Sequence, residues 1–194
     1  MRFFKFFSFL TVLCVLLYLI CFAAEGSVYN DVVRFHVIAN SDSEIDQQIK
    51  LSVRDFVLQK YSSTLSKYKN KEDALAAAEK MLPNIEKDVN EYLKEYFEYS
   101  ATVSIEESYF PTKTYGEYSL PRGKYTALCI RLGKAKGQNY WCVLFPPLCL
   151  GTAAEDTEKV FEECGLSKGE YNLMRAEKIR YKLKFKILEM FAGE

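Results

Sequence analysis

The segment RFHVIANSDSEIDQQIK, residues 34–50, gathers the residue types from which catalytic sites are built. It holds His36, the only histidine of the chain, two residues after Arg34, and aspartates follow shortly afterwards. A histidine acts as a general base when a carboxylate orients its second ring nitrogen and a nucleophile lies within hydrogen-bond reach. One hypothesis is therefore an exported hydrolase that uses His36 together with Asp42 or Asp55.

The same segment also has the pattern of a strand that ends, turns and caps a helix. Two sets of residues alternate along it: Val33, Phe35, Val37 and Ala39 on one face, and Val32, Arg34, His36, Ile38 and Asn40 on the other. Ser41 precedes Glu44 by three residues, which is the spacing of a capping box. The chain contains no G-x-S-x-G, no H-E-x-x-H and no phosphate-binding glycine loop. We therefore expect Arg34 and His36 to be structural, with a hydrogen-bond partner for His36, or to belong to a surface that recognises a partner.

Two helices are predicted after this strand. Apolar residues recur at helical spacing up to about Tyr61, namely Ile45, Ile49, Val53 and Phe56. Asp46 and Lys50 fall on the solvent side of this first helix and could pair at i,i+4. A second helix begins near Lys71, with Asn70 as its cap, and Pro83 predicts a kink or a restart within it.

The second half of the chain changes to strand periodicity. Residues 101–109 alternate, and residues 124–133 and 139–146 have the pattern of a hairpin joined by GKAKGQ. Two prolines and two glycines make the stretch 110–125 an ordered but irregular loop. A helix at 155–165 and a strand at 179–187 that runs into a short terminal helix are predicted near the end of the chain. The expected fold class is α+β, with a largely antiparallel sheet packed against helices.

The N-terminus has the character of an export signal. Arg2 and Lys5 precede an uncharged apolar run, residues 6–24, and acidic residues lie beyond it. This charge order places the start of the segment in the cytoplasm and the rest of the chain outside. Residues 1–24 are therefore expected to be a signal peptide or a membrane anchor, either of which contacts the membrane. Residues 28–194 are expected to form a single exported domain.

Composition and cysteine content limit the other function classes. The 26 acidic and 26 basic side chains balance, which argues against nucleic acid as a partner. With no CxxC pair and no second histidine, we expect no metal site and no cofactor. In an oxidising compartment Cys142 and Cys149, which flank VLFPPL, are expected to form a disulfide; the alternative is two buried thiols.

Two stretches rich in aromatics and prolines are candidates for partner binding. FPTKTYG and YWCVLFPPLC combine these residues into rigid loops, which bind at low entropic cost. Lys113, Tyr115 and Trp141 are the candidate contacts, in addition to Arg34 and His36. The alternative is that these loops simply pack against the sheet. The basic run 175–186 has the pattern of a solvated edge strand, although it could also contact anionic lipid.

Three long motifs resemble a known family. RFHVIANSDSEIDQQIKLSVRD, YFPTKTYGEYSLPRGKYTAL and GQNYWCVLFPPLC are similar, in this order and spacing, to stage II sporulation protein R of endospore-forming Firmicutes. The resemblance spans about residues 31–150. Residues 151–194 correspond to a more variable part of the family.

This resemblance implies a signalling role rather than an enzymatic one. Family members are secreted from the forespore into the space between its two surrounding membranes. There they activate a membrane-embedded aspartic protease of the mother cell, which then processes the precursor of the early mother-cell sigma factor. No family residue carries a catalytic role that could be transferred to this chain. Residues 6–24 would either be removed or anchor the protein in the membrane.

Overall fold

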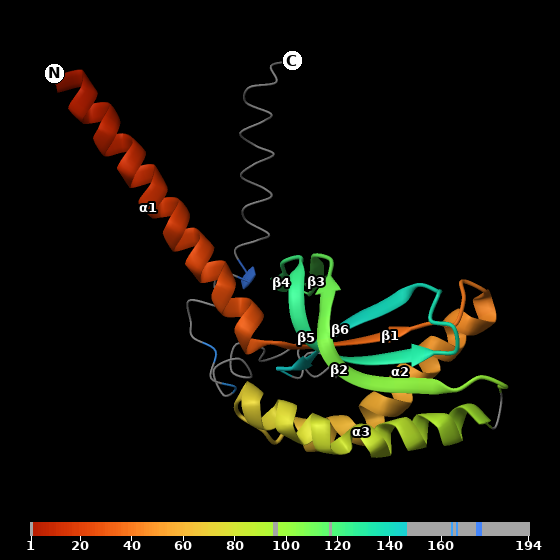
Figure 1. Cartoon of the computed structure of the whole chain (residues 1–194). Coiled ribbons are helices and arrows are strands. Elements are labelled where there is room, and N and C mark those ends of the chain that lie inside the picture. The colour runs from red at the N-terminus through yellow and green to blue at the C-terminus, as the bar shows by residue number, and fades with distance from the viewer. Residues whose placement is uncertain are drawn as a thin grey trace.

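The computed structural model describes residues 2–94, 97–116 and 118–146, together with Cys164, Leu166, Met174 and Arg175. Within these residues the fold is α+β, as expected (Figure 1). The helices are α1 (Arg2–Asp31), α2 (Glu44–Leu65) and α3 (Lys71–Lys94). The strands are β1 (Val33–Ile38), β2 (Ala101–Phe110), β3 (Lys113–Tyr115), β4 (Tyr118–Leu120), β5 (Gly123–Leu132) and β6 (Asn139–Phe145).

Four strands form a mixed sheet in the order β2-β5-β1-β6. β1 is parallel to β5 and antiparallel to β6, and β2 is antiparallel to β5. The predicted hairpin of β5 and β6 is therefore wrong, and the sheet is less antiparallel than expected. β1 lies between β5 and β6 because it is buried on both faces, and a strand without a solvent face is most stable at the centre of a sheet.

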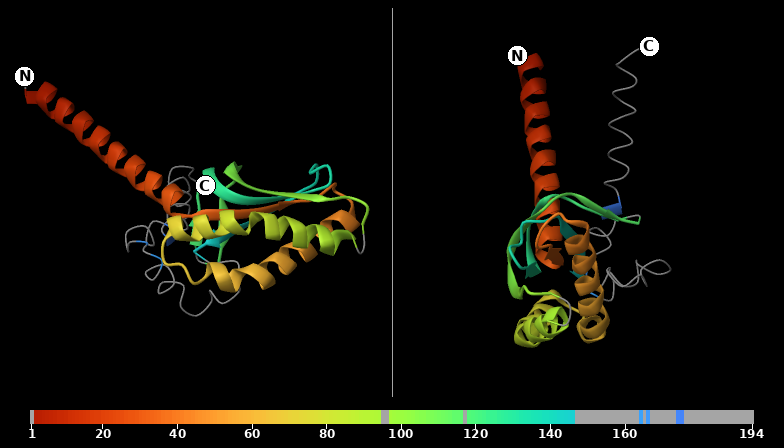
Figure 2. Two further views of the ribbon diagram at one scale, coloured as in Figure 1. Left: turned by 60° about the horizontal axis from the view of Figure 1, so that its bottom comes forward. Right: turned by 90° about the vertical axis from the view of Figure 1, so that its right-hand side faces the viewer.

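The sheet has a buried cluster on each face. Helices α2 and α3 lie against one face (Figure 2), where they cover Phe35 and Val37 of β1 with Val53, Ile85 and Val89. The opposite face carries a smaller cluster, made of Val32, Phe110, Leu120, Tyr125, Ala127, Cys129, Val143, Leu166 and Met174. The alternation predicted for β1 is confirmed, and it places Arg34 and His36 on this second face.

The start of α2 differs from the predicted capping box. The N-cap is Ser43, whose hydroxyl accepts a hydrogen bond from the Asp46 amide at 3.2 Å. Asp46 and Lys50 are buried instead of solvated, and Ile45 is 65% exposed instead of buried. The predicted face of the helix is therefore wrong for these three residues, because polar groups of neighbouring loops surround the first turn of α2.

Helix α3 begins as predicted but does not restart. The Asn70 side chain accepts a hydrogen bond from the Asp73 amide at 2.8 Å, so the predicted cap is confirmed. The helix then continues through Pro83 as one element. Asn90 and Glu86 of α3 bond the backbone of β2 at Ala101 and Val103, which covers part of that edge strand.

The stretch predicted to be an irregular loop contains a small hairpin. β3 and β4 pair antiparallel, with Tyr115 opposite Tyr118, and Gly116 in the turn has φ +58°. Such a φ favours glycine because a side chain would be strained there. Lys113 and Tyr115 therefore lie on a strand.

Helix α1 extends away from the sheet and its covering helices (Figure 1). Among the described residues, no helix combines the length and apolar character needed to cross a bilayer. The signal peptide or anchor at residues 1–24 stays a prediction. The predicted helix at 155–165 and strand at 179–187 lie outside the described residues, as does the basic run 175–186 except for Arg175.

Candidate functional site

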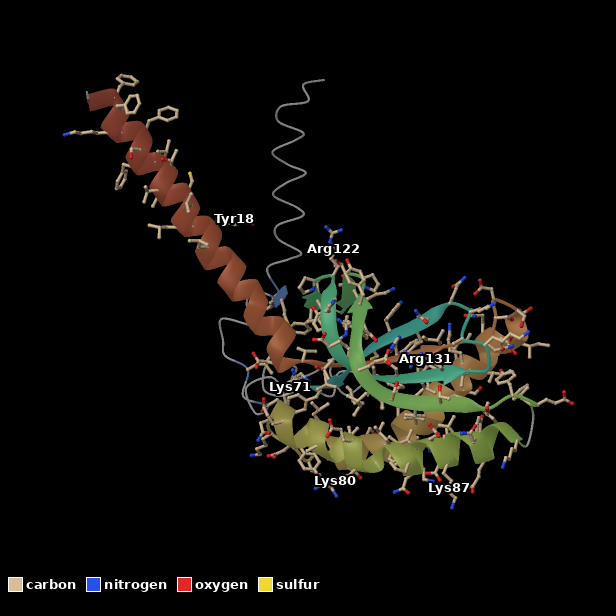
Figure 3. All side chains as sticks on the ribbon, in the orientation of Figure 1. Tyr18, Lys71, Lys80, Lys87, Arg122 and Arg131 are labelled. Atoms are coloured by element: carbon tan, nitrogen blue, oxygen red, sulfur yellow. The ribbon has the colours of Figure 1, made fainter. Side chains whose placement is uncertain are left out.

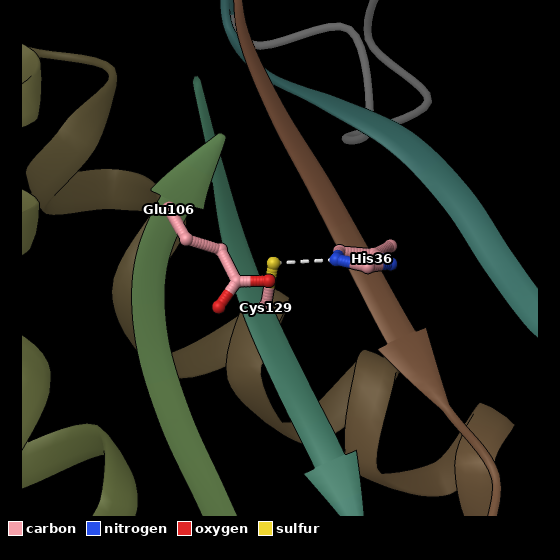
Figure 4. Close-up of side chains that lie close together, drawn as sticks. All are labelled: His36, Glu106 and Cys129. Carbon is pink, nitrogen blue, oxygen red and sulfur yellow. Dashed lines mark hydrogen bonds between the residues drawn. The ribbon is translucent and has the colours of Figure 1, made fainter. Parts of the chain in front are cut away.

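Side chains from all four strands form a row on the sheet face opposite the helices. His36 of β1 lies between Cys129 of β5 and Trp141 of β6, its register partners on either side. Glu106 of β2 lies next to Cys129 (Figure 4). The three potential ligand atoms of His36, Glu106 and Cys129 all lie within 4.8 Å of one another.

His36 is held between a thiol and an aromatic ring. Its Nε2 lies 2.5 Å from the Sγ of Cys129, and its ring stacks on Trp141 with centroids 5.1 Å apart and planes 7° apart. His36 thus has a hydrogen-bond partner, as expected for a structural strand histidine, and this partner is the thiol of Cys129. Burial lowers the pKa of His36 to about 4, and the positive charge of Arg131 contributes in the same direction. The imidazole is therefore neutral at physiological pH.

Cys129 is a fully buried free cysteine. Burial raises the pKa of its thiol to about 11. A nucleophilic cysteine needs a thiolate, which usually requires a depressed pKa and some solvent access. The His36–Cys129 pair is therefore a neutral thiol–imidazole contact and lacks the character of an activated nucleophile.

Glu106 is positioned by a set of polar neighbours. Arg131 forms an ion pair with its Oε1, and Ser108 donates a hydrogen bond to the same oxygen at 3.1 Å. Ser104 donates to Oε2 at 3.2 Å. Burial raises the pKa of Glu106, but the hydrogen bonds from Arg131 and Ser108 outweigh this effect and hold the pKa below its usual range. Arg131, which is labelled in Figure 3, reaches Glu106 from the neighbouring strand β5.

The carboxylates proposed as partners of His36 are engaged elsewhere. Asp42 accepts a hydrogen bond from the Gln138 amide at 2.8 Å, and Asp55 pairs with Arg54 at 2.7 Å. The structure brings Glu106 to the histidine instead. The pairing of His36 with Asp42 or Asp55 was therefore wrong. Among the described residues, Asp42 bonds its loop neighbour and Asp55 its helix neighbour, and neither contacts the imidazole.

Glu106, Cys129 and Arg131 were not predicted from the sequence as members of this cluster. The sequence pattern that could have identified them is the alternation of side chains along their strands. Ser104, Glu106 and Ser108 alternate with the apolar face of β2, so they form a polar stripe. The register of β2 against β5, which the sequence does not give, places that stripe beside Cys129.

The polar residues after β1 build a junction between loops. Asn40 Oδ1 accepts a hydrogen bond from the Lys134 amide at 2.9 Å. The Asp46 carboxylate accepts hydrogen bonds from Asn40, Ser41 and Tyr99. Lys50 donates to the backbone carbonyl of Gln138 at 3.1 Å. The motif ANSDSE therefore joins the end of β1 to the β5–β6 connection and the start of α2.

Arg34 is fully buried among aromatic rings. Its guanidinium carbon lies 4.4 Å from the centroid of Phe110 and 4.9 Å from that of Tyr125. Its Nε donates to the Cys142 carbonyl at 3.0 Å and its Nη2 to the Tyr115 hydroxyl at 2.8 Å. Burial lowers the pKa of Arg34, and the neighbouring tyrosines oppose this effect. In this structure Arg34 therefore links β1, β6 and the β3–β4 hairpin inside the fold.

The five candidate contact residues differ in accessibility. Arg34 and His36 are buried, so neither presents its side chain on the surface of this structure. Lys113, Tyr115 and Trp141 are partly buried, and the Tyr115 hydroxyl also bonds the Trp141 carbonyl at 3.3 Å. Tyr115 thus faces inward toward Arg34. Their predicted role in binding a partner stays a prediction.

Cys142 is disulfide-bonded. The predicted partner, Cys149, lies outside the described residues, so this pairing also stays a prediction. Cys129 is not part of a disulfide.

Comparison with known proteins agrees with the resemblance of the three motifs. The family model described as stage II sporulation protein R matches residues 29–156. Stage II sporulation protein R of Bacillus subtilis (strain 168) is 36% identical over 150 residues, which covers 69% of this chain and 67% of the relative. No solved structure matches the chain at a significant level. The matched range includes the row of side chains around His36 and the β3–β4 hairpin.

Proposed function

The chain belongs to the family of stage II sporulation protein R and is a sporulation protein, and on this premise we propose that it is an exported signal. It is secreted from the forespore into the space between the two membranes, where residues 6–24 are either removed or hold it at the membrane. There it activates a membrane-embedded aspartic protease of the mother cell. That protease then processes the precursor of the early mother-cell sigma factor.

The family match over residues 29–156 is the observation that carries this proposal. The chemistry around His36 supports a binding role over a hydrolytic one. The nearest thiol is protonated and fully buried, and the imidazole contacts it directly. An exported hydrolase that used His36 would need a nucleophile with access to substrate.

The β3–β4 hairpin is our candidate for the surface that contacts the protease. Tyr115 ties the hairpin to Arg34 and to the β6 backbone, so little motion would be lost on binding. Lys113 and the exposed Thr114 lie on the same strand. Of these residues Lys113 is the best probe, because changing its charge leaves the internal contacts of Tyr115 intact.

The experiment is reconstitution in a host that does not sporulate. The full chain is co-expressed with the protease and with the sigma-factor precursor, and the processed fraction is measured by immunoblot. We expect processing only when all three proteins are present. A chain with Leu13→Asp and Leu16→Asp, which break the apolar run, serves as the matched control and should be inactive because it is not exported.

Lys113→Glu tests the hairpin in the same assay. We expect a reduction in processing of about tenfold or more, as for a residue near the centre of an interface, with an unchanged thermal midpoint. Lys124→Glu, an exposed lysine on β5, is the control for a change of net charge. Equal processing with and without the chain would contradict the proposed function. A fully active Lys113→Glu protein would exclude only the hairpin.

A further inference from the structure

We propose that His36, Cys129 and Glu106 form a binding site for one divalent transition-metal ion, with zinc as the preferred ion. The three residues offer a nitrogen, a sulfur and a carboxylate oxygen, which is the donor set that zinc accepts in proteins. Their sequence spacing has no resemblance to a zinc motif, because the ligands come from three different strands. This inference is independent of the proposed signalling role.

The geometry of the three donor atoms fits a single small ion. Zinc binds nitrogen, oxygen and sulfur at about 2.0–2.3 Å, so neighbouring ligand atoms of a tetrahedral site lie about 3.5 Å apart. Here His36 Nε2 and Cys129 Sγ are 2.5 Å apart, and all three donors lie within 4.8 Å of one another. The separation of about 3.5 Å that a zinc site requires lies between these two distances. Entry of the ion needs the nitrogen and sulfur to part by about 1 Å.

Neighbouring residues hold all three ligands in place, although His36 Nδ1 has no hydrogen-bond partner among the described residues. The stacked Trp141 ring fixes the plane of the imidazole. Hydrogen bonds from Arg131, Ser104 and Ser108 fix the carboxylate. Cys129 and His36 are register partners in the centre of the sheet, so their backbones are held rigidly.

Charge and access are also consistent with a cation. The side chain of Glu106 is 36% exposed at the β2 edge, so the carboxylate connects the buried thiol and imidazole to solvent. When the ion binds, the Cys129 thiol releases its proton to solvent and the thiolate becomes a ligand. The two anionic ligands then balance the ion, and Arg131 keeps its ion pair with Glu106. A water molecule would complete the four ligands.

The test is a direct measurement of metal binding by the full chain. The protein is purified with an affinity tag free of histidine, so that His36 is its only imidazole, and is stripped with a chelator. Zinc is then titrated in, and the bound ion is counted by elemental analysis after dialysis. Cobalt is substituted in parallel, because a thiolate ligand gives a charge-transfer band and a tetrahedral site gives intense visible bands.

We expect one zinc per chain and a cobalt spectrum with thiolate charge transfer. Cys129→Ser should remove the charge-transfer band, and His36→Gln should weaken binding by more than the 10–100-fold that is typical of supporting residues. Glu106→Gln changes a partly exposed side chain, so it tests the site even if the other two variants fail to fold. Cys14→Ser, an exposed cysteine on α1, is the control and should bind as the wild type does.

Two outcomes would overturn the proposal. One is a folded wild-type chain that retains no stoichiometric zinc and gives no thiolate band with cobalt, which leaves a plain thiol–imidazole contact. The other is binding that survives Glu106→Gln and Cys129→Ser unchanged, which would place the ion elsewhere.

Discussion

At the scale of single residues, the buried polar side chains explain the chemistry-rich segment after β1. Arg34, His36, Asp46 and Lys50 are all buried, and each makes at least one hydrogen bond within the described residues. Only Arg34 Nη1 and His36 Nδ1 of these side chains lack a partner there. Buried polar groups without partners are costly, so these contacts constrain how the surrounding loops can pack. The segment that resembles a catalytic motif thus acts mainly as a structural junction.

Asp46→Asn is expected to destabilise the protein by about 1–3 kcal/mol near neutral pH, because the neutral amide accepts hydrogen bonds less well than the carboxylate does. Burial raises the pKa of Asp46, but hydrogen bonds from Ser41, Asn40 and Tyr99 outweigh burial and hold the pKa below its usual value. Since the folded pKa is depressed, the carboxylate stabilises the fold above its unfolded pKa, and this contribution is lost as the pH falls through the folded pKa. The difference between wild type and variant should therefore shrink as the pH falls below the usual pKa range of an aspartate.

Urea denaturation of both proteins at neutral and acidic pH measures this effect. Asp55→Asn is the matched control on the same helix, because Asp55 is exposed and its ion pair among the described residues is with Arg54. That surface pair is expected to contribute less than about 1 kcal/mol. An Asp46→Asn protein as stable as Asp55→Asn would show that the hydrogen bonds to Asp46 do not stabilise the fold.

Tyr115→Phe tests the buried Arg34 contact. The variant keeps the ring beside the guanidinium but removes the hydroxyl that accepts a hydrogen bond from Nη2 at 2.8 Å. Loss of a hydrogen bond to a charged group is expected to lower the free energy of unfolding by about 1.5–3 kcal/mol. Tyr109→Phe, at a tyrosine that is 61% exposed, should change the urea midpoint little. Equal midpoints for the two variants would show that the Arg34 contact contributes little to stability.

At the scale of elements, the sequence predicted local secondary structure better than it predicted which strands pair. The Asn70 cap, the alternation around β1 and at residues 101–109, and the α+β class are confirmed because they depend on neighbouring residues. The position of β1 between β5 and β6 was missed, because their short connection also fits a hairpin. Glu106 therefore became a neighbour of His36 through register alone, which no local pattern reveals.

Pro83→Ala is expected to raise the free energy of unfolding by about 1–2 kcal/mol. Proline in a helix interior lacks an amide donor and clashes with the preceding turn, at a cost of about 3 kcal/mol, but it also restricts the unfolded chain by about 1 kcal/mol. The site is exposed, so alanine meets no packing restriction. Asn84→Ala, the next exposed position of α3, controls for helix propensity alone. A gain no larger than that of Asn84→Ala would mean that the helix accommodates Pro83 without a net cost.

At the scale of the whole molecule, the cysteines should report the compartment that the chain has reached. Disulfides persist in oxidising compartments and are rare where cellular thiols keep cysteines reduced. Cys142 is disulfide-bonded in the structure, while Cys129 is a free thiol enclosed by the sheet. If the N-terminal segment directs export, oxidation of Cys142 should therefore depend on that segment, whereas Cys129 should stay reduced in either compartment.

We predict that the exported chain contains a Cys142–Cys149 disulfide, and that the chain with Leu13→Asp and Leu16→Asp keeps both cysteines reduced in the cytoplasm. Free thiols are blocked in denaturant without reductant, and peptides are then identified by mass spectrometry. Cys129 should be alkylated in both samples, which shows that the blocking reagent reached buried thiols. A linked Cys142–Cys149 peptide in the exported sample alone would support both the pairing and the export signal. Alkylated Cys142 and Cys149 in the exported chain would refute the pairing, and a disulfide in both samples would show that it forms independently of export.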